Sequence, residues 1–595
     1  MKVDKILLLF PPVWTPFSPP CLGLPSLTAY CNDHGYSTDQ LDVSIEVFDI
    51  MMSKKYLEEF YTEIDEHLSR LENQPTVKES RPKHDELVLS RSILESAIEQ
   101  VESVKALYRS DDEPIEVINR RVAGCRLLDY LFQALSAPYY PTRVSIQAYN
   151  SRYMSDLKLH SLLLGVKDIN ENFYSRIFSE DMLPRILKYN ADIVGLSLSG
   201  ISQLLPCLTL ADLIKSADPS AKIVLGGALI PYMGPSLSMP ELFSVIDMVV
   251  MGEGEHCLVS IADAMENNSD LEGLPNLIFK DKQGKIKVTE KEYIEDMNML
   301  PTPSFDGLDL CKYLVPEGCL PLLTSRGCYW DRCSFCSLCS SYLNRYRERA
   351  MGSVIQDIKT LIKKYGLTYV IFNDEVLSPH RINALSKALL DSGVNIYWRG
   401  LARFEGSFDQ EIFRKAYESG CREMSFGLES ASPRILEAMN KGISVETAQK
   451  VLKQCHDAGI WTGVFVLFGF PGETSEDANE SIKFFETNHD IIDSMETNIL
   501  KIEQGSRLFR NASELGISIK EDQRDYYLIY NEREYYIEKG GPYQGEAQKS
   551  LDLCTERLQK LPLWKIRLRI FANEMYFRYA VRYGRDNVRT FLSTT

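Results

Sequence analysis

Short apolar runs alternate with polar turns over the first fifty residues of the chain. Residues 6–10 are all apolar and end at Pro11-Pro12, an apolar helix-like stretch covers 24–31, and a second strand-like run covers 38–43. Short apolar runs that end at proline or glycine are typical of buried strands. Strand, helix and strand in this order predict the start of an α/β domain with a parallel sheet.

Between about residues 50 and 185 the spacing of apolar positions becomes helical. Leu94, Ala97, Val101 and Val104 recur at three- and four-residue intervals, which places them on one face of a helix. We therefore expect a helical insertion within the first domain. Strand-like runs then return and complete a predicted Rossmann-like domain over residues 1–300; these runs are 192–198, 222–227 and 247–255.

Beyond residue 300, strand-like runs are each followed by a helical stretch and repeat at intervals of about 30 residues, the size of a βα unit. Six such units predict a partial (β/α)6 barrel over about 301–505, with catalytic loops at the carboxyl ends of its strands. The strand candidates are 322–325, 369–373, 396–400, 423–427, 463–468 and 497–501. Residues 506–595 form a separate C-terminal region.

Composition narrows the class of protein. The chain has 595 residues, 44% of them apolar and 25% charged, and a net charge of −17, which argues against a broad nucleic-acid surface. No apolar run approaches the roughly 18 residues that a membrane span needs. The 14 cysteines show no disulfide-scaffold pattern and fit a reducing compartment. We expect a cytoplasmic protein with no nucleic-acid or membrane partner.

Three cysteines, Cys328, Cys333 and Cys336, fall within nine residues directly after a strand-like run and the turn Arg326-Gly327. Three thiolates on one loop hold three irons of a [4Fe–4S] cluster and leave the fourth iron open to a small molecule. Zinc is the alternative, because Cys339 extends the run and four cysteines also suit a zinc ion.

The cysteine loop resembles the cluster loop of radical S-adenosylmethionine (SAM) enzymes. An aromatic residue, Phe335, precedes the last cysteine, as is usual in that superfamily, and the loop follows a strand. The spacing is C-x4-C-x2-C here and C-x3-C-x2-C in most members, and the CYW-x-x-C-x-F-C form resembles cobalamin-binding radical enzymes of peptide maturation. The resemblance implies a [4Fe–4S] cluster on Cys328, Cys333 and Cys336, SAM on the open iron, and a one-electron donor such as flavodoxin or ferredoxin.

The same resemblance implies a SAM site on successive strand ends. A carboxylate after the second strand would accept hydrogen bonds from the amino group of SAM, Arg403 would meet its carboxylate, Glu429 and Ser430 its ribose, and the loop at Gly469 its adenine. The candidates after the second strand are Asn373, Asp374 and Glu375. Taken singly, Arg403 also suits a surface or salt-bridge arginine, 373–375 a helix N-cap, and Gly469 a simple turn.

Small residues end the strands of the first domain, where backbone can closely approach a large flat ligand. This pattern, above all Gly-Glu-Gly-Glu at 252–255, resembles the cobalamin-binding domain fused to radical SAM enzymes; a generic doubly wound domain is the alternative. No D-x-H-x-x-G motif supplies a cobalt ligand, so the lower cobalt face is expected to be open or occupied by another group. The candidate contacts are Ser197, Ser199, Gly200, Gly226, Gly227, Gly252, Glu253 and Gly254.

Together these resemblances imply a cobalamin-dependent radical SAM C-methyltransferase. A 5′-deoxyadenosyl radical would take hydrogen from an unactivated carbon of a peptide or another natural product, and methylcobalamin would deliver the methyl group. No residue is assigned to catalysis itself. Rearrangement, ring contraction or cyclisation with the same cofactors, and a cobalamin- and metal-binding sensor, are the alternatives. The C-terminal region, rich in tyrosine, is expected to cap the barrel and shape the substrate pocket, as in related enzymes; ordinary packing is the alternative.

Overall fold

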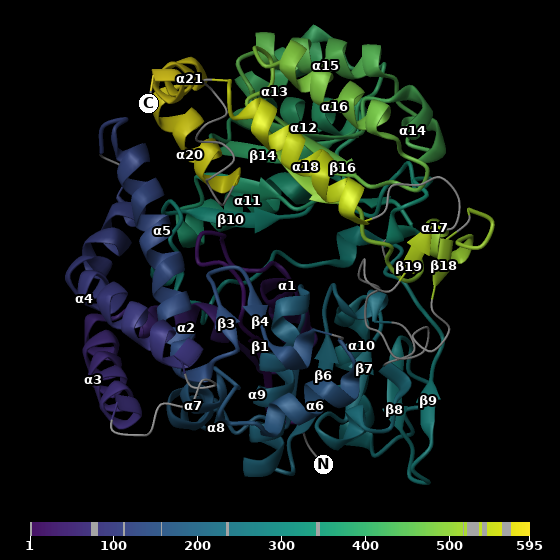
Figure 1. The fold of residues 1–595 in the computed structure, drawn as a ribbon. Coiled ribbons are helices and arrows are strands. Elements are labelled where there is room, and N and C mark those ends of the chain that lie inside the picture. Colours follow the sequence, from purple (N-terminus) through teal and green to yellow (C-terminus); the bar gives the residue numbers. More distant parts are fainter. Residues whose placement is uncertain are drawn as a thin grey trace. The chain divides into compact units, whose positions relative to one another are not determined.

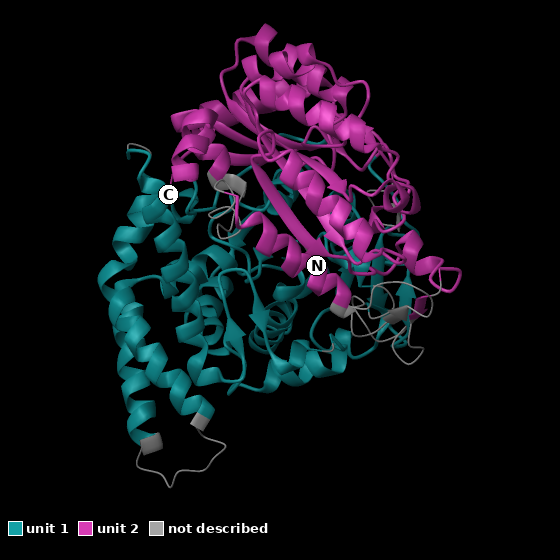
Figure 2. Cartoon of the chain, turned by 45° about the horizontal axis from the view of Figure 1, so that its top comes forward, with its two compact units in different colours: residues 1–294, 300–315, 526–528 teal, residues 295–299, 316–525, 529–595 magenta. Residues whose placement is uncertain are grey.

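The computed structural model describes residues 3–72, 81–110, 113–155, 157–233, 237–340, 345–515, 517–519, 535–537, 544–561 and 573–594. The chain divides into two compact units (Figure 2). Unit 1 consists of residues 1–294, 300–315 and 526–528, and unit 2 of residues 295–299, 316–525 and 529–595.

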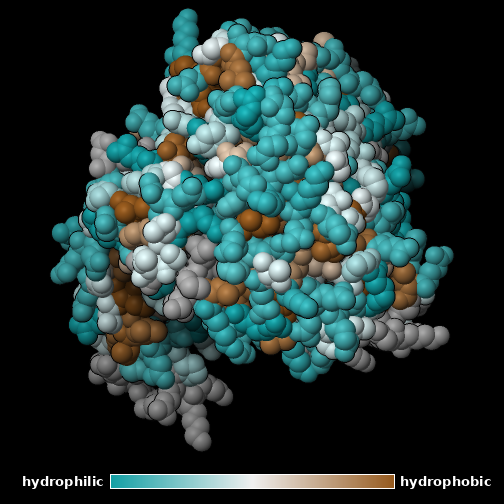
Figure 3. All heavy atoms as spheres, turned by 90° about the horizontal axis from the view of Figure 1, so that it is seen from above, coloured by the Kyte–Doolittle hydropathy of each residue, from teal (hydrophilic) through white to brown (hydrophobic). Residues whose placement is uncertain are grey.

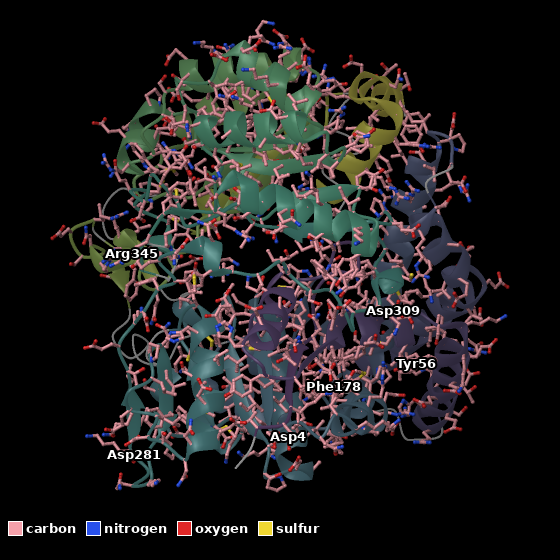
Figure 4. All side chains as sticks on the ribbon, turned by 180° about the vertical axis from the view of Figure 1, so that it is seen from behind. Asp4, Tyr56, Phe178, Asp281, Asp309 and Arg345 are labelled. Carbon is pink, nitrogen blue, oxygen red and sulfur yellow. The ribbon has the colours of Figure 1, made fainter. Side chains whose placement is uncertain are left out.

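A seven-stranded sheet forms the centre of unit 1. Its strands, in spatial order, are β2 (Thr38–Asp42), β1 (Ile6–Phe10), β5 (Ile193–Ser197), β6 (Lys222–Gly226), β7 (Met248–Val250), β8 (Leu277–Lys280) and β9 (Ile286–Val288). The first five are parallel, as predicted, whereas β8 and β9 add an antiparallel edge that the sequence pattern did not indicate. Asp281 lies in the turn between β8 and β9 (Figure 4).

The order of these strands reverses between β1 and β5. From β1 the chain first adds β2 on one side and then β5, β6 and β7 on the other. Open α/β sheets bind ligands at such a reversal, outside the carboxyl ends of the strands. One face of the sheet is covered by α1 (Gly23–Asp33) and α10 (Gly254–Asn267), whose Tyr30 and Ile261 share a core with Ile6, Leu8 and Phe10.

The predicted insertion is mainly helical (Figure 1). Helix α3 packs against α4, and α4 against α5. A short antiparallel pair, β3 (Arg143–Val144) and β4 (Tyr149–Asn150), interrupts the helices. The helices between β2 and β6 are α2 (Val43–Met51), α3 (Lys54–Glu72), α4 (Arg81–Arg109), α5 (Val117–Ser136), α6 (Leu159–Lys167), α7 (Ser175–Ile177), α8 (Leu183–Leu187) and α9 (Leu204–Ala217).

Unit 2 is built on six parallel strands that follow one another in sequence order, which confirms the six predicted units. They are β10 (Cys319–Leu322), β13 (Tyr369–Phe372), β14 (Tyr397–Ala402), β15 (Cys421–Glu429), β16 (Trp461–Phe468) and β17 (Ser494–Ile499). Helices on the connections are α11 (Met351–Tyr365), α12 (Pro379–Ser392), α13 (Gln410–Glu418), α14 (Pro433–Ala438), α15 (Val445–Asp457) and α16 (Ser475–Thr487).

The prediction for the first strand of the barrel, 322–325, was wrong by three residues. Strand β10 ends at Leu322, and Ser325-Arg326 forms β11 (Ser325–Arg326), which pairs antiparallel with β12 (Arg347–Glu348). The buried carboxylate of Asp374 accepts hydrogen bonds from the backbone N–H of Thr324 and from the hydroxyls of Thr324 and Ser325. These bonds draw the chain out of the parallel ladder just before the cysteine loop.

The last two described helices cover the amino ends of the barrel strands. Tyr576 of α20 (Asn573–Tyr583) stacks on Trp461, the first residue of β16, with ring centroids 4.8 Å apart, and Phe577 packs edge-on against Tyr369, the first residue of β13. Helices α17 (Arg507–Arg510), α18 (Gln544–Leu558) and α21 (Arg585–Thr594), with β18 (Ile517–Ile519) and β19 (Tyr535–Ile537), complete the region. Helices α20 and α21 therefore do not cap the carboxyl ends, and Tyr526, Tyr527 and Tyr530 lie outside the described residues.

No helix within the described ranges is both long and apolar enough to cross a membrane. Hydrophilic residues cover most of the face seen in Figure 3, and apolar residues form separate groups on it.

Candidate functional site

The cysteine loop leaves the sheet of unit 2 after β10 and β11. Gly327 opens it with a φ of 89°, a left-handed backbone conformation that favours glycine. Cys328, Cys333 and Cys336 are half-buried thiols on this one loop. The side chain of Cys339 lies outside the described residues. The predicted loop, placed after the first strand at the carboxyl end of the sheet, is therefore present.

Charges around the loop act directly on its thiols. Burial raises the pKa of Cys333, and the positive charges of Lys441 and Arg403 lower it again. Burial, together with the nearby Cys333 and Cys328 thiols, raises the pKa of Cys336 to about 12. Three mutually close thiols beside two cations fit a cluster that carries negative charge. Among the described residues, no group of three or more His, Cys, Asp or Glu side chains is arranged around one point as a single metal ion requires.

The segment after α14 holds the cysteine loop in place. The backbone N–H of Ser334 donates to the carbonyl of Met439 at 2.9 Å, and the indole N–H of Trp330 donates to the carbonyl of Asn440 at 3.0 Å. On the other side, the N–H of Leu508 in α17 donates to the carbonyl of Ser334 at 2.7 Å. Phe335 packs among the apolar residues beneath these segments, including Ile435. Phe335 therefore anchors the loop between two segments.

Trp330 lies between Arg403 and Gly442. The guanidinium of Arg403 is 4.2 Å from the centroid of the indole ring, a cation–π contact. A side chain at Gly442, whose φ is 67°, would overlap the same ring. Arg403 is buried and also donates to the carbonyl of Lys441 at 2.8 Å and to Glu405 at 3.1 Å. Arg403 is therefore not a surface residue, but the salt-bridge alternative is confirmed, because its guanidinium pairs with Glu405.

Lys441 and Glu429 form a buried ion pair beside the loop. Lys441 Nζ donates to Glu429 Oε1 at 2.8 Å, and the Lys441 ammonium lies 5.8 Å from the centroid of the Phe335 ring. Burial alone would lower the pKa of Lys441, but the carboxylate of Glu429 and the thiol of Cys333 raise it, so the lysine stays charged. Glu429 sits at a bulge of β15 with a φ of 68°. Sequence reasoning missed Lys441, although it lies in the Asn-Lys-Gly run that follows Glu429.

The three candidates after β13 have different surroundings. Asp374 is buried in the bonds to Thr324 and Ser325 described above, whereas Asn373 and Glu375 are exposed. The Glu375 side chain reaches solvent, but dense protein surrounds it, and this desolvation together with the charge of Asp374 raises its pKa to about 7. The N-cap alternative for 373–375 is wrong, because the side chain of Ser378 caps α12. Asp374 thus supports the cysteine loop, and Asn373 and Glu375 remain accessible to a ligand.

Two other predicted SAM contacts serve the packing of the barrel. Ser430 is fully buried, its hydroxyl lies 3.3 Å from that of Ser481 in α16, and it accepts the N–H of Ser432 at 3.1 Å. Its side chain therefore joins β15 to α16. Gly469 has a φ of 87°, and a Cβ at this position would lie 2.7 Å from Cβ of Ala547 in α18. Both the turn and the close approach of α18 require this glycine.

In unit 1, Gln203 joins the loops at the strand reversal. Its side-chain oxygen accepts the N–H groups of Ser199 and Gly200 at 2.7 and 2.9 Å, and its amide donates to the carbonyl of Pro11 at 2.6 Å. Ser197, Ser199 and Gly200 are half-exposed, and a Cβ at Gly200 would meet nothing within 4 Å. The carboxyl end of β5 thus forms a partly open rim of small residues, which leaves space for a large flat ligand.

At the other strand ends of unit 1, most of the predicted ligand contacts face protein instead. A Cβ at Gly227, whose φ is 112°, would overlap the backbone of Leu198, so packing within the unit requires this glycine. Three further candidates also face protein: a Cβ at Gly252 would lie 3.3 Å from the side chain of Asn276, one at Gly254 would lie 3.1 Å from Leu27, and the buried Glu253 accepts the N–H of Ile294. Gly226 is more open, with its nearest neighbour 3.8 Å away.

Comparisons with known proteins agree with this geometry. A model described as the Radical SAM superfamily matches residues 322–485, and one described as a B12 binding domain matches residues 163–262. An uncharacterised methyltransferase of Pyrococcus horikoshii is 30% identical over 355 residues, which are 59% of this chain and 75% of that protein. The anaerobic magnesium-protoporphyrin IX monomethyl ester cyclase of Rubrivivax gelatinosus is 27% identical over 51% of this chain and 56% of the cyclase.

The fold of the whole chain is also found in a solved structure. The radical SAM methyltransferase TsrM from Kitasatospora setae, solved with cobalamin and a [4Fe–4S] cluster, aligns with a TM-score of 0.59 over 100% of both chains at 16% identity. The expected resemblance to peptide-maturation enzymes has no support in these comparisons, and the zinc and sensor alternatives have none either. The chain belongs to the cobalamin-binding radical SAM enzymes, whose cofactors are a [4Fe–4S] cluster, SAM and cobalamin.

Proposed function

We propose that this enzyme is a methyltransferase that adds a methyl group to an unactivated carbon of a natural product or peptide. The observation that carries the proposal is the 30% identity to a methyltransferase across 75% of its length. When bound, the cluster and SAM supply one-electron cleavage to a carbon radical, and cobalamin supplies the methyl group.

The residues of unit 2 bind and orient these cofactors. Cys328, Cys333 and Cys336 are proposed as the cluster ligands. Glu375, with Asn373 beside it, is proposed to accept hydrogen bonds from the amino group of SAM. Arg403 remains our candidate for the carboxylate of SAM, and Glu429 for its ribose hydroxyls. Arg403 and Glu429 are supported by their contacts beside the cysteine loop, because Arg403 stacks on Trp330 and Glu429 pairs with Lys441. Both lie at the carboxyl ends of the strands, where barrel enzymes bind their ligands.

The residues of unit 1 are proposed to hold cobalamin at the strand reversal. Ser197, Ser199 and Gly200 line the open rim there, and Gln203 fixes the backbone that carries them. Gly226 is the neighbouring open position. Gly227, Gly252, Glu253 and Gly254 are proposed to act indirectly, because each faces protein and shapes the loops on which the open positions lie.

A second candidate keeps the cofactors but changes the product. The relative from Rubrivivax gelatinosus is a cyclase rather than a methyltransferase, and it is 27% identical over half of this chain. Ring formation or rearrangement through a substrate radical would use the same cluster and SAM site and would leave no methyl group on the product.

The experiment is an anaerobic reconstitution with iron, sulfide and hydroxocobalamin, followed by SAM, dithionite and a panel of candidate substrates. Formation of 5′-deoxyadenosine together with S-adenosylhomocysteine supports methyl transfer. Deoxyadenosine alone, with a substrate-dependent product of unchanged carbon count, supports cyclisation. Absence of both from a protein that holds iron and cobalamin contradicts the proposal.

A matched pair of cysteine variants assigns the chemistry to the loop. Cys333→Ala is expected to abolish deoxyadenosine formation and lower the iron content, because the cluster loses a ligand. Cys311→Ala is the control, since Cys311 is an exposed thiol outside the loop and its loss should change neither quantity.

A further inference from the structure

We propose that the Lys441–Glu429 ion pair sets the reduction potential of the cluster, with the two side chains acting in opposite directions. The inference rests on the proposed function only in requiring a cluster on the cysteine loop. It gives Lys441 a role as a positioning and tuning residue that acts through the cluster, distinct from any contact that the pair makes with SAM.

The location of the pair carries the argument. Lys441 and Glu429 are both buried, and their 2.8 Å contact lies at the carboxyl end of β15. The Lys441 ammonium lies 5.8 Å from the ring of Phe335, the residue directly before Cys336. Charges in such a water-poor place interact far more strongly than charges in water. Salt screens them little, because neither side chain is open to solvent.

Packing holds the ammonium at this place. A Cβ at Gly427 would lie 2.5 Å from Glu429 Oε1 and 2.9 Å from Lys441 Nζ, so the pair fills the space that this glycine leaves. The carbonyl of Lys441 accepts the guanidinium of Arg403 at 2.8 Å, and Arg403 in turn stacks on Trp330 of the cysteine loop. The lysine is therefore fixed to the loop through its backbone as well as through its side-chain charge.

The sign of each effect follows from charge balance. On reduction, one electron from the donor enters the cluster, which passes from the 2+ to the 1+ state with no bond formed or broken and no proton taken up. The reduced cluster is more negative by one charge. A nearby ammonium favours that form and raises the reduction potential, whereas a nearby carboxylate disfavours it and lowers the potential. In the wild type the two effects partly cancel.

The test is a redox titration of the reconstituted cluster with dithionite, followed by electron paramagnetic resonance in the absence of SAM. Lys441→Met is expected to lower the midpoint potential, because the carboxylate remains without its partner. Glu429→Gln is expected to raise it, because the ammonium remains. We expect each shift to be about 60 mV, which is a tenfold change in the one-electron equilibrium.

Two further variants make the result specific. Lys441→Arg keeps the positive charge and should keep the potential near that of the wild type. Lys359→Met removes an exposed lysine on α11 and should shift nothing. A purely structural role for the pair would move the potential of Lys441→Met and Glu429→Gln in the same direction, or would only lower iron content and thermal stability.

Failure of this inference can be distinguished from failure of the proposed function. Equal potentials in all variants with intact clusters would overturn the tuning role while leaving methyl transfer untouched. Opposite shifts in a protein that forms no S-adenosylhomocysteine would support tuning and contradict methyl transfer. The double variant Lys441→Met/Glu429→Gln should return the potential toward that of the wild type, and an additive fall in both single variants would overturn the proposal.

Discussion

The two proposed cofactor regions of this chain are each stabilised internally, by different kinds of contact. In unit 2, side chains fix the cysteine loop: Trp330 lies between Arg403 and Gly442, and Lys441 pairs with Glu429 beside it. In unit 1, the rim at the strand reversal is mainly backbone and small residues, held by the amide of Gln203. The region proposed to hold a compact charged cluster uses buried charges, whereas the region proposed to hold a large flat cofactor leaves space.

Gly442→Ala should break the side-chain arrangement of unit 2 most severely. The added methyl group would overlap the ring of Trp330, and the φ of 67° would be strained for alanine. We expect the cysteine loop to be displaced from the segment at Gly442. Activity should then fall on the order of 100-fold, and iron incorporation on reconstitution should be incomplete. Deoxyadenosine formation and iron analysis are the measurements.

Gly352→Ala is the control for this variant. Gly352 lies within α11, and a Cβ there meets nothing within 4 Å, so alanine should stabilise the helix slightly. Normal iron content in Gly442→Ala would show that the loop does not depend on its contact with Trp330.

In unit 1, two glycine variants separate packing from ligand space. Gly227→Ala would overlap the backbone of Leu198 at a φ of 112° and should destabilise the protein by about 3 kcal/mol. Gly200→Ala meets nothing within 4 Å, so its thermal midpoint should stay unchanged. If cobalamin lies on this rim, Gly200→Ala should nevertheless weaken cobalamin binding about tenfold, or 1.4 kcal/mol. Unchanged cobalamin affinity in Gly200→Ala would show that the cofactor does not bind at the end of β5.

The sequence predicted the positions of chemical groups better than their orientation. Spacing and strand order placed Cys328, Arg403 and Glu429 correctly at the carboxyl ends of the first, third and fourth strands. It did not show that Asp374 and Ser430 face the packing side, because neighbouring residues at a strand end leave in different directions. Lys441 was missed because a lone lysine after a helix has no pattern of its own until folding returns it to β15.

The edge of the first sheet and the reasons for its glycines were also beyond the sequence. Strands β8 and β9 are short, and β8 pairs antiparallel with β7 across the intervening helix α10, whereas a parallel continuation would have looked the same in the sequence. Gly227 looked like a ligand contact because a glycine at a strand end serves both uses. Only the position of Leu198 shows that packing requires it.

The pH dependence of SAM binding tests which acid at the barrel end meets the ligand. The pKa of Glu375 is about 7 rather than its usual 4.5, so its carboxylate, the form that accepts hydrogen bonds from an ammonium, accumulates as pH rises through 7. SAM affinity should therefore rise by up to about tenfold between pH 6 and 8, within the range of a hydrogen bond to a charged group. Calorimetric titration of SAM into the Glu375→Gln variant should show weaker binding that does not change with pH.

The contribution of Glu375 to folding stability changes with pH in the opposite direction to SAM affinity. A carboxyl group with a raised pKa in the folded state binds more protons there than in the unfolded chain, so its contribution to stability falls as pH rises from about 4.5 toward 7. Glu473 also has a pKa of about 7, and Glu473→Gln is the control: it should keep the pH dependence of SAM binding. Loss of that dependence in Glu473→Gln but not in Glu375→Gln would reassign the ammonium contact.

The smallest effect is expected at the amino end of the same barrel. Tyr576 stacks on Trp461 at 4.8 Å, and α20 covers the starts of β13 and β16. Tyr576→Leu keeps apolar bulk but removes the aromatic pair, which should destabilise the protein by about 1 kcal/mol. Cluster content, SAM affinity and deoxyadenosine formation should not change, because the chemistry lies at the opposite ends of these strands. A change in SAM affinity without a change in thermal midpoint would mean that the two ends of the barrel are coupled, so the contrast between a supporting end and a reactive end would no longer hold.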